Sequence, residues 1–204
     1  DLNKFAGMDC YTGVDLAATS DLTAVAYLVV QDGTYYFKTH YYLPESALKD
    51  KADKELYKYW KQQGYLTVTS GNVTDYDYIT ADMLRYADVV NIQSVGYDKY
   101  NATQWAIDST EQGLPLEEYP QTLGNFNMPT RELERLILSG KAVIDNNEIN
   151  RYCFRNVTLK SDYNGNVKPN KAVDKKKIDG TIAMIQALGM YLRNPRFSNE
   201  IITI

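Results

Sequence analysis

The chain has 204 residues and a formal net charge of −4 at pH 7, which suits one domain with its own core and argues against binding nucleic acid through overall charge. It has no apolar run of the ~20 residues that a membrane span needs, and no GxxxxGK[ST] loop of a P-loop ATPase. Its only two cysteines, Cys10 and Cys153, lie far apart in the sequence and predict neither a disulfide framework nor a zinc site. Positive charge is concentrated in residues 160–177, where six Lys and two Asp give +4 and leave −8 for the rest of the chain.

The first predicted element is a strand over residues 12–17, followed by a polar turn and a second strand that starts near Asp21. Because side chains alternate along a strand, Gly13, Asp15 and Ala17 point to the same side. A carboxylate there is costly unless a cation lies beside it. We therefore expect Gly13 and Ala17 to leave room for a hydrated metal or a phosphate. The alternatives are that Asp15 is exposed at an edge and that Asp21 only caps the turn.

Residues 22–30 and 34–42 are rich in β-branched and aromatic residues, and Asp32–Gly33 separates them. Asp-Gly between two such runs is a strong hairpin signal. The first three strands are therefore predicted to form an antiparallel meander. The single histidine, His40, lies in the third strand with no nucleophile motif nearby, and we interpret it as structural.

The middle of the chain alternates helices and short strands. Ser46 is predicted to cap a helix that runs to about Gln62, residues 66–69 form a strand, and Asp75 caps a helix that runs to about Val90.

A second candidate acid follows the next strand, which is predicted at residues 94–97. Asp98 lies at its carboxyl end, and Asn101 is predicted to cap a helix that runs to about Gln112. Ligands bind at the carboxyl ends of strands in α/β sheets, so Asp98 is a candidate site residue. The alternative is that Asp98 only helps to start the helix.

The segment after that helix is predicted to hold a strand at 116–119, an irregular loop at 122–128, a helix from Pro129 or Thr130 to about Ser139, a strand at 141–144 and a helix at 150–156. Residues 157–173 are predicted to form a basic β-hairpin with Asn164–Gly165 at its tip. Since the hairpin is polar and basic, we expect it to project into solvent.

The last predicted element is a helix over residues 174–192. Its buried stripe consists of Ile178, Ile182, Ile185 and Leu188. Asp179 lies beside this stripe in the second turn, followed by the small residues Gly180 and Ala183, which again suggests room for a cation. The alternative is an acid placed favourably near the positive end of the helix dipole.

Together the three acids form a pattern: one on the first strand of a meander, one at the end of a later strand, and one on a late helix. This order of elements is typical of the ribonuclease H-like arrangement, a mixed central sheet flanked by helices in which three carboxylates hold two divalent ions. Such ions can activate a water and stabilise the leaving 3′ oxygen of a phosphodiester. Carboxylates suit Mg²⁺ and Mn²⁺, which prefer oxygen ligands.

A family resemblance rests on motifs that span nearly the whole chain. They are GVDLAATSDLTAV, HYYLPESAL, GYLTVTSGNVTDYDYI, GYDKYNA, QTLGNFNMPTRELERLILSGK and KIDGTIAMIQALG. In this order they resemble the nuclease domain of the terminase large subunit of tailed bacteriophages. The first motif alone is moderately specific, whereas the ordered set is highly specific.

The resemblance implies a single ribonuclease H-like nuclease domain over residues 1–204, which cuts concatemeric viral DNA at the start and end of capsid filling. By position, Asp15, Asp98 and Asp179 match the catalytic, metal-binding acids of the family, and Asp21 matches an acid that assists the metal site in some members. The implied cofactors are two divalent ions, Mg²⁺ or Mn²⁺.

The resemblance also implies partners and a location. The partners are double-stranded DNA, the portal, the small terminase subunit and an ATPase domain on the same full-length chain. The location is the packaging motor in the host cytoplasm, with no membrane. Because the ATPase half is absent and the sequence begins at Asp1 rather than Met, we expect a chain cut at a domain boundary.

The lysines before the last acid have two interpretations. They are a solvated charge run, or they hold the DNA backbone across an otherwise acidic site. In the second case the DNA-binding residues are Lys160, Lys168, Lys171, Lys175, Lys176 and Lys177.

Two other functions stay open at this stage. Actin- or sugar-kinase-like ATP-binding domains also open with a strand, Gly-x-Asp and a small polar turn, but they need two such domains, and no second copy of the turn is present. A non-catalytic DNA-binding or docking module with structural acids is the other alternative.

Overall fold

A computed structural model of the chain describes residues 1–17, 21–50, 53–100, 102–173 and 176–194. Within these residues the centre is a seven-stranded mixed sheet in the order β4-β3-β2-β1-β5-β6, with β7 paired to β3. A separate two-stranded sheet is formed by β8 and β9. The strands are β1 (Asp9–Asp15), β2 (Thr23–Gln31), β3 (Thr34–Pro44), β4 (Thr67–Thr69), β5 (Asn91–Tyr97), β6 (Leu116–Glu118), β7 (Ala142–Ile144), β8 (Val157–Ser161) and β9 (Val167–Lys171).

The predicted mixed sheet, an antiparallel meander extended by parallel strands, is confirmed. β2 pairs antiparallel with both β1 and β3. Asp32 and Gly33 both have positive φ, 51° and 71°, as the two-residue turn of a tight hairpin requires. β5 pairs parallel with β1, and β6 with β5. The carboxyl ends of β1, β5 and β6 therefore lie at one edge of the sheet.

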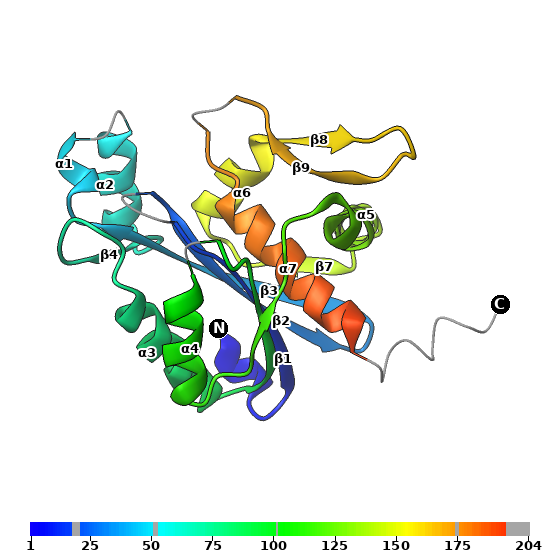
Figure 1. Ribbon diagram of the computed structural model, residues 1–204, viewed down its shortest axis with the longest axis horizontal. Helices are drawn as coiled ribbons and strands as arrows, with labels where there is room; N and C mark the ends of the chain where they lie inside the picture. The colour runs from blue at the N-terminus through cyan, green and yellow to red at the C-terminus, as the bar shows by residue number, and fades with distance from the viewer. Residues whose placement is uncertain (18–20, 51–52, 101, 174–175, 195–204) are drawn as a thin grey trace.

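Helices cover both faces of this sheet (Figure 1). They are η1 (Leu2–Phe5), α1 (Ala47–Asp50), α2 (Lys54–Gln62), α3 (Tyr76–Ala87), α4 (Thr103–Glu111), α5 (Leu123–Leu138), α6 (Glu148–Arg155) and α7 (Asp179–Arg193). One hydrophobic cluster lies under α5, α6 and α7, and the other lies under η1, α3 and α4. No helix among the described residues is long and apolar enough to cross a membrane.

Helix α7 is more deeply enclosed than its predicted stripe indicates. Every residue from Gly180 to Tyr191 is buried, because α7 packs against β1, β2 and β5 on one side and α5 and α6 on the other. The helix begins at Asp179, not at residue 174 as predicted, which places the acid in the first turn. Residues 174 and 175 lie outside the described part.

The space beside two glycines, which was expected to hold a cation, is occupied by other parts of the protein. A Cβ on Gly13 would lie 2.1 Å from the Ala183 carbonyl oxygen, and one on Gly180 would lie 1.8 Å from the Tyr41 hydroxyl. Small residues on β1 and α7 therefore serve close packing of helix on sheet, and that expectation was wrong.

Two helix predictions also need correction. The helix predicted from Ser46 to Gln62 is divided into α1 and α2, with Asp53 at the start of α2 and residues 51–52 not described. Helix α5 begins at Leu123 and contains Pro129, which was predicted to start it. Proline removes one helical hydrogen bond, and the Asn125 carbonyl, four residues earlier, accepts one from the Tyr119 hydroxyl at 2.7 Å.

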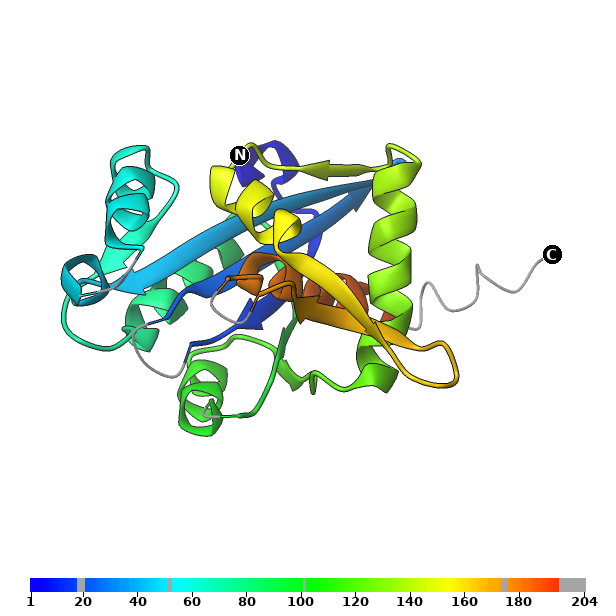
Figure 2. The ribbon, with the colours of Figure 1, turned by 90° about the horizontal axis from the view of Figure 1, so that it is seen from above.

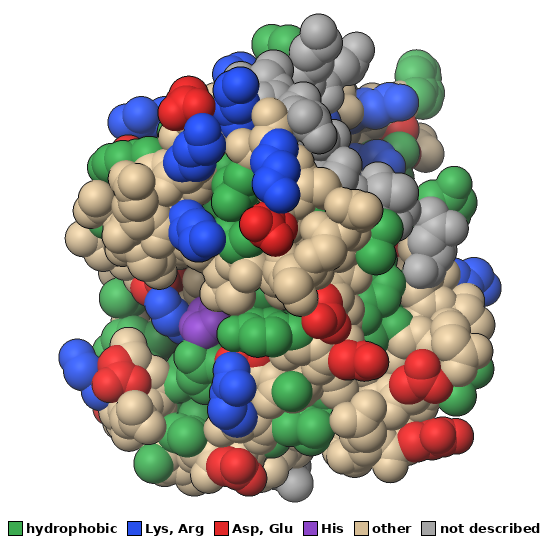
Figure 3. All heavy atoms as spheres, turned by 90° about the vertical axis from the view of Figure 1, so that its left-hand side faces the viewer, with side chains coloured by type: hydrophobic (Ala, Val, Ile, Leu, Met, Phe, Trp, Pro, Cys, Tyr) green, Lys and Arg blue, Asp and Glu red, His purple; other side chains and the backbone are tan. Residues whose placement is uncertain are grey.

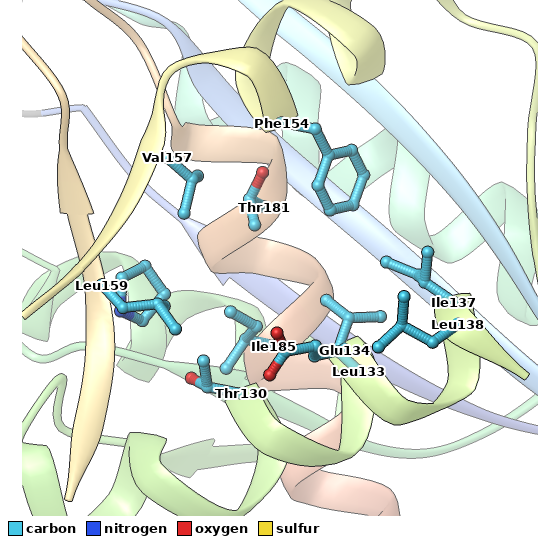
Figure 4. Close-up of a pocket in the computed structure, with 11 residues that line it drawn as sticks. Thr130, Leu133, Glu134, Ile137, Leu138, Phe154, Val157, Leu159, Thr181 and Ile185 are labelled. Carbon is cyan, nitrogen blue, oxygen red and sulfur yellow. The ribbon is translucent and has the colours of Figure 1, made fainter. Parts of the chain in front are cut away.

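The β8–β9 hairpin lies over α5 rather than standing free in solvent (Figure 2). Its buried Pro169 lines, with Leu159, an apolar pocket of about 230 Å³ between the hairpin and helices α5, α6 and α7 (Figure 4). Figure 4 shows mainly aliphatic and aromatic side chains around this pocket, and none of the candidate acids or lysines lines it. The hairpin is therefore anchored to the domain by apolar contacts.

Candidate metal centre

Asp15 and Asp98 lie at the carboxyl ends of two neighbouring parallel strands. β1 ends at Asp15, and Asp98 directly follows β5. In the register of the pair, Val14 is opposite Tyr97, so the two acids come next on their strands. Both side chains are half-buried. The predicted strand-end position of Asp98 is confirmed, and it places the acid beside Asp15.

Gln121, which was not among the predicted site residues, connects these two acids. The Gln121 side-chain Nε2 donates to Asp15 Oδ1 at 3.0 Å, and the Gln121 backbone N–H donates to Asp98 Oδ2 at 2.9 Å. The other oxygen of Asp98 accepts from the Tyr100 backbone N–H at 3.0 Å. Gln121 closely follows β6, so the strand-end rule that selected Asp98 could also have selected it.

Asp179 approaches the same edge from above, because α7 packs on β1 at Gly13 and the acid lies one turn before Ala183. Its Oδ2 atom is buried and has no hydrogen-bond partner among the described residues. Burial, followed by repulsion from Asp21, raises the pKa of Asp179 to about 6. A buried carboxylate oxygen that no donor satisfies is the kind of group that a cation stabilises.

Asp15 interacts electrostatically with Asp179 and Asp98. Burial is the main cause that raises the pKa of Asp15 well above its usual value, and the charge of Asp179 is the next. Asp98 contributes in the same direction, while Gln121 and Lys171 oppose the shift. A cation bound among carboxylates that repel one another in a low-dielectric site would stabilise their ionised forms.

Asp21 differs from the other three acids because the protein itself neutralises it. Lys177 Nζ donates to Asp21 Oδ2 at 2.7 Å, and the Leu22 backbone N–H donates to Oδ1 at 2.9 Å. Although burial opposes the shift, the Lys177 contact lowers the pKa of Asp21. Asp21 therefore lies near Asp179, whose pKa its charge raises, but already has a cationic partner.

The lysines of the basic segment occupy different environments. Lys160 is exposed and lies directly opposite Lys168 in the hairpin, and Lys168 Nζ donates to the Gln121 carbonyl at 3.2 Å. The charge of Lys171 lowers the pKa of Asp15, Asp21 and Asp179.

Nearer the last helix, Lys177 pairs with Asp21, and Lys176 lies 5.7 Å from the centre of the Tyr152 ring. Lys175 lies outside the described residues, as does Asn101, the predicted cap of α4. A helix from residue 174 would have placed Lys175 one turn before Asp179, but residues 176–178 are not helical and α7 begins only at Asp179.

Basic side chains also gather elsewhere. On the face that carries α1 and α2, lysine and arginine side chains lie mainly in the upper part, and acidic ones lie below and to the right (Figure 3). Helices α1 and α2 carry four exposed lysines, Lys49, Lys54, Lys58 and Lys61. Positive charge on the surface is therefore not restricted to residues 160–177.

The donor set fits a hard divalent cation, but the acids do not form a closed ligand shell in this structure. Among the described residues, no three His, Cys, Asp or Glu side chains lie close enough together to hold one metal ion. The raised pKa values of Asp15 and Asp179 and the unsatisfied Oδ2 of Asp179 nevertheless mark one electrostatically strained group. Only carboxylate oxygens are offered, which suits Mg²⁺ and Mn²⁺ better than zinc.

Comparison with known proteins identifies one family and several relatives of this chain. Residues 1–194 match the family model described as the endonuclease domain of the terminase large subunit. Protein YmfN of Escherichia coli K12 is 31% identical over 221 residues, covering 98% of this chain and 48% of that protein. The terminase large subunit of Enterobacteria phage HK97 is 29% identical over 184 residues, covering 88% of this chain and 36% of the relative. The chain thus spans about half or less of these relatives.

Solved structures agree with this match. The crystal structure of the HK97 large terminase superposes with a TM-score of 0.81 at 28% identity, covering 89% of this chain and 39% of that one. The large terminase nuclease of thermophilic phage G20c shares the fold at 12% identity, with a TM-score of 0.60 and coverage of 89% and 80%. Crystals of that G20c nuclease carry magnesium or cobalt. The family match over nearly the whole chain decides against the kinase-like alternative, and the chain belongs to the family of terminase large subunit endonuclease domains.

Proposed function

We propose that residues 1–204 are a single nuclease domain that hydrolyses phosphodiester bonds of double-stranded DNA with two divalent ions, Mg²⁺ or Mn²⁺. The observation that carries the proposal is the group of mutually repelling carboxylates where β1 and β5 end beneath the start of α7. A hydrated cation would relieve this repulsion, which the charge of Lys171 opposes only in part.

Asp15, Asp98 and Asp179 are the residues that we expect to hold the ions and to be catalytic. When bound, two ions at such a site supply an activated water and stabilise the charge on the leaving oxygen. Asp15 and Asp98 would fix the ions against the rigid strand edge, and Asp179 would close the site from α7. Asp21 would assist indirectly, by holding Lys177 beside the site.

The lysines of the basic segment would hold the phosphate backbone of DNA. Lys160 and Lys176 are the plainest candidates, because neither has a carboxylate partner in the contacts described above, whereas Lys168, Lys171 and Lys177 also serve the acidic site. Lys175 remains a candidate from the sequence alone. Contacts to phosphates position DNA without reading its sequence, so we expect little sequence preference from this domain.

In its biological setting we propose that the domain cuts concatemeric viral DNA during genome packaging. The matched relatives are two to three times longer, which is consistent with an ATPase domain on the full-length chain. The portal and the small terminase subunit would be its other partners, and the host cytoplasm its location.

A plasmid-cleavage assay tests the proposed activity. Supercoiled plasmid is incubated with the purified domain and Mg²⁺, Mn²⁺ or a chelator, and nicked and linear products are separated on a gel. We expect cleavage with either metal and none with chelator, and a rise in melting temperature on adding Mn²⁺ to the metal-free protein. Absence of both cleavage and the melting shift would show a non-catalytic DNA-binding or docking module instead.

A further inference from the structure

Gln121 makes three contacts that meet at the acidic edge of the sheet. Its side-chain amide donates to Asp15, and its backbone N–H donates to Asp98, at 3.0 and 2.9 Å. Its backbone carbonyl accepts from Lys168 Nζ at 3.2 Å. One residue between β6 and α5 is therefore bonded to two acids and to the basic hairpin.

We propose that Gln121 is a positioning residue for the nuclease reaction, which fixes Asp15 and Asp98 relative to each other so that both can face a common divalent ion. This inference rests on the proposed function of the same acids. Gln121 itself touches neither metal nor DNA in the proposal; it acts through the two carboxylates.

The chemistry of the side chain suits this role. A carboxamide donates a hydrogen bond without adding charge, so it can orient Asp15 without neutralising the carboxylate that the metal needs. A lysine in the same place would compete with the cation, and a carboxylate would add repulsion. Hydrogen-bond partners of metal ligands commonly change metal affinity or activity by about 10- to 100-fold when they are removed.

The backbone around Gln121 is held in place by its neighbours in the chain. Pro120 precedes Gln121, and its carbonyl accepts from Asn125 Nδ2 at 2.9 Å. Thr122 caps the start of α5. The Gln121 amide is thus held between a proline and a helix start, and the Lys168 contact ties the same segment to β9.

The test measures Mn²⁺ affinity by calorimetry, DNA affinity with Ca²⁺ in place of the active metal, and kcat and KM for plasmid cleavage. For Gln121→Ala and for the similarly long Gln121→Met, which lacks the N–H donor and adds no charge, we expect kcat to fall about 10- to 100-fold and Mn²⁺ affinity to weaken by a similar factor. DNA affinity and KM should change less than twofold. A purely structural role would not separate kcat from KM in this way.

Thr122→Ala is the matched control, because it disturbs the same segment without touching an acid. It should lower the melting temperature slightly and leave Mn²⁺ affinity unchanged. Wild-type Mn²⁺ affinity and kcat in both Gln121 variants would overturn the inference while leaving the proposed function intact. If the wild-type domain neither bound Mn²⁺ nor cut DNA, the proposed function itself would fail.

Discussion

Two clusters of partly buried acid on opposite faces of the sheet show how differently a carboxylate can be held. On the side of α3, Asp82 accepts from the Tyr42 hydroxyl and the Arg85 guanidinium, and His40 Nδ1 lies 3.6 Å from it. Although burial opposes the shift, these contacts lower the pKa of Asp82 to about 2. On the side of α7, Asp15 and Asp179 have raised pKa values.

Burial raises the pKa of the acids in both clusters, and the clusters differ in the partners that stabilise the ionised form. Asp82 is surrounded by donors from β3 and α3, so its ionised form is stabilised by the protein. Asp179 has an oxygen that no described donor satisfies, and the charge of Asp21 raises its pKa more than the charge of either Lys171 or Lys177 lowers it. A carboxylate that maintains structure is matched within the protein, whereas one that waits for a cation is not. Four experiments test this contrast.

The largest effect is expected from Asp15→Asn. The substitution keeps the shape but removes a charge from the metal site, and a lost metal contact worth about 3 kcal/mol or more lowers the rate ~100-fold or more. Plasmid cleavage with Mg²⁺ measures it. Asp82→Asn is the control and should cut at the wild-type rate per folded molecule. Cleavage by Asp15→Asn at the wild-type rate would remove Asp15 from the site.

The effects of the same two substitutions on stability should be the reverse of their effects on cleavage. Asp82→Asn weakens the hydrogen-bonded charge contacts with Tyr42, Arg85 and His40, so we expect the free energy of unfolding to fall by about 1–3 kcal/mol. Asp15→Asn removes repulsion from Asp179 and should leave the metal-free protein as stable as wild type or more so. Urea unfolding with chelator at neutral pH compares the two. A clear destabilisation by Asp15→Asn would contradict the proposed contrast.

The pH dependence of stability should differ in sign between the clusters. The pKa of Asp179 is raised from 3.8 to about 6, so its ionisation costs stability as pH rises through that range. Metal-free wild type should therefore lose stability relative to Asp179→Asn between about pH 4 and pH 6, on the order of 1–3 kcal/mol, with no further loss from this group at higher pH. Asp82, with its pKa lowered from 3.8 to about 2, contributes stability above about pH 4 that is lost as pH falls toward 2.

Thermal melts of wild type, Asp179→Asn and Asp82→Asn across this pH range check both signs. The informative quantity is the difference between wild type and each variant. A difference for Asp179→Asn that does not change with pH would show that its carboxylate is already compensated.

The smallest effect concerns the hairpin. Lys160 is exposed and makes no hydrogen bond or ion pair with the acidic group among the described residues, so Lys160→Ala should remove one phosphate contact without disturbing the metal site. The slope of log affinity against log salt for duplex DNA should fall by about 0.9, measured with Ca²⁺ to prevent cleavage. The Mn²⁺-induced melting shift should persist. Lys4→Ala, in exposed η1 on the other face, is the control; an equal change in both variants would refute a specific hairpin contact.

Features that depend on local pattern could be predicted from the amino-acid sequence. The Asp32–Gly33 turn between two β-prone runs predicted the meander, since few residue pairs adopt positive φ twice in succession. The alternation of side chains and the strand-end position predicted Asp15 and Asp98, because a carboxylate on a buried strand needs a reason to be there.

What lies beside those residues depends on how distant segments pack, and local pattern does not predict it. The space at Gly13 is occupied by the backbone of α7, the Asn125 carbonyl within α5 accepts from the Tyr119 hydroxyl, and Gln121 contacts two acids from the loop that follows β6. The partner of Asp21 is Lys177, 156 residues away. Periodicity describes which way a side chain points, but which distant segment fills the space opposite it is fixed by how whole elements pack.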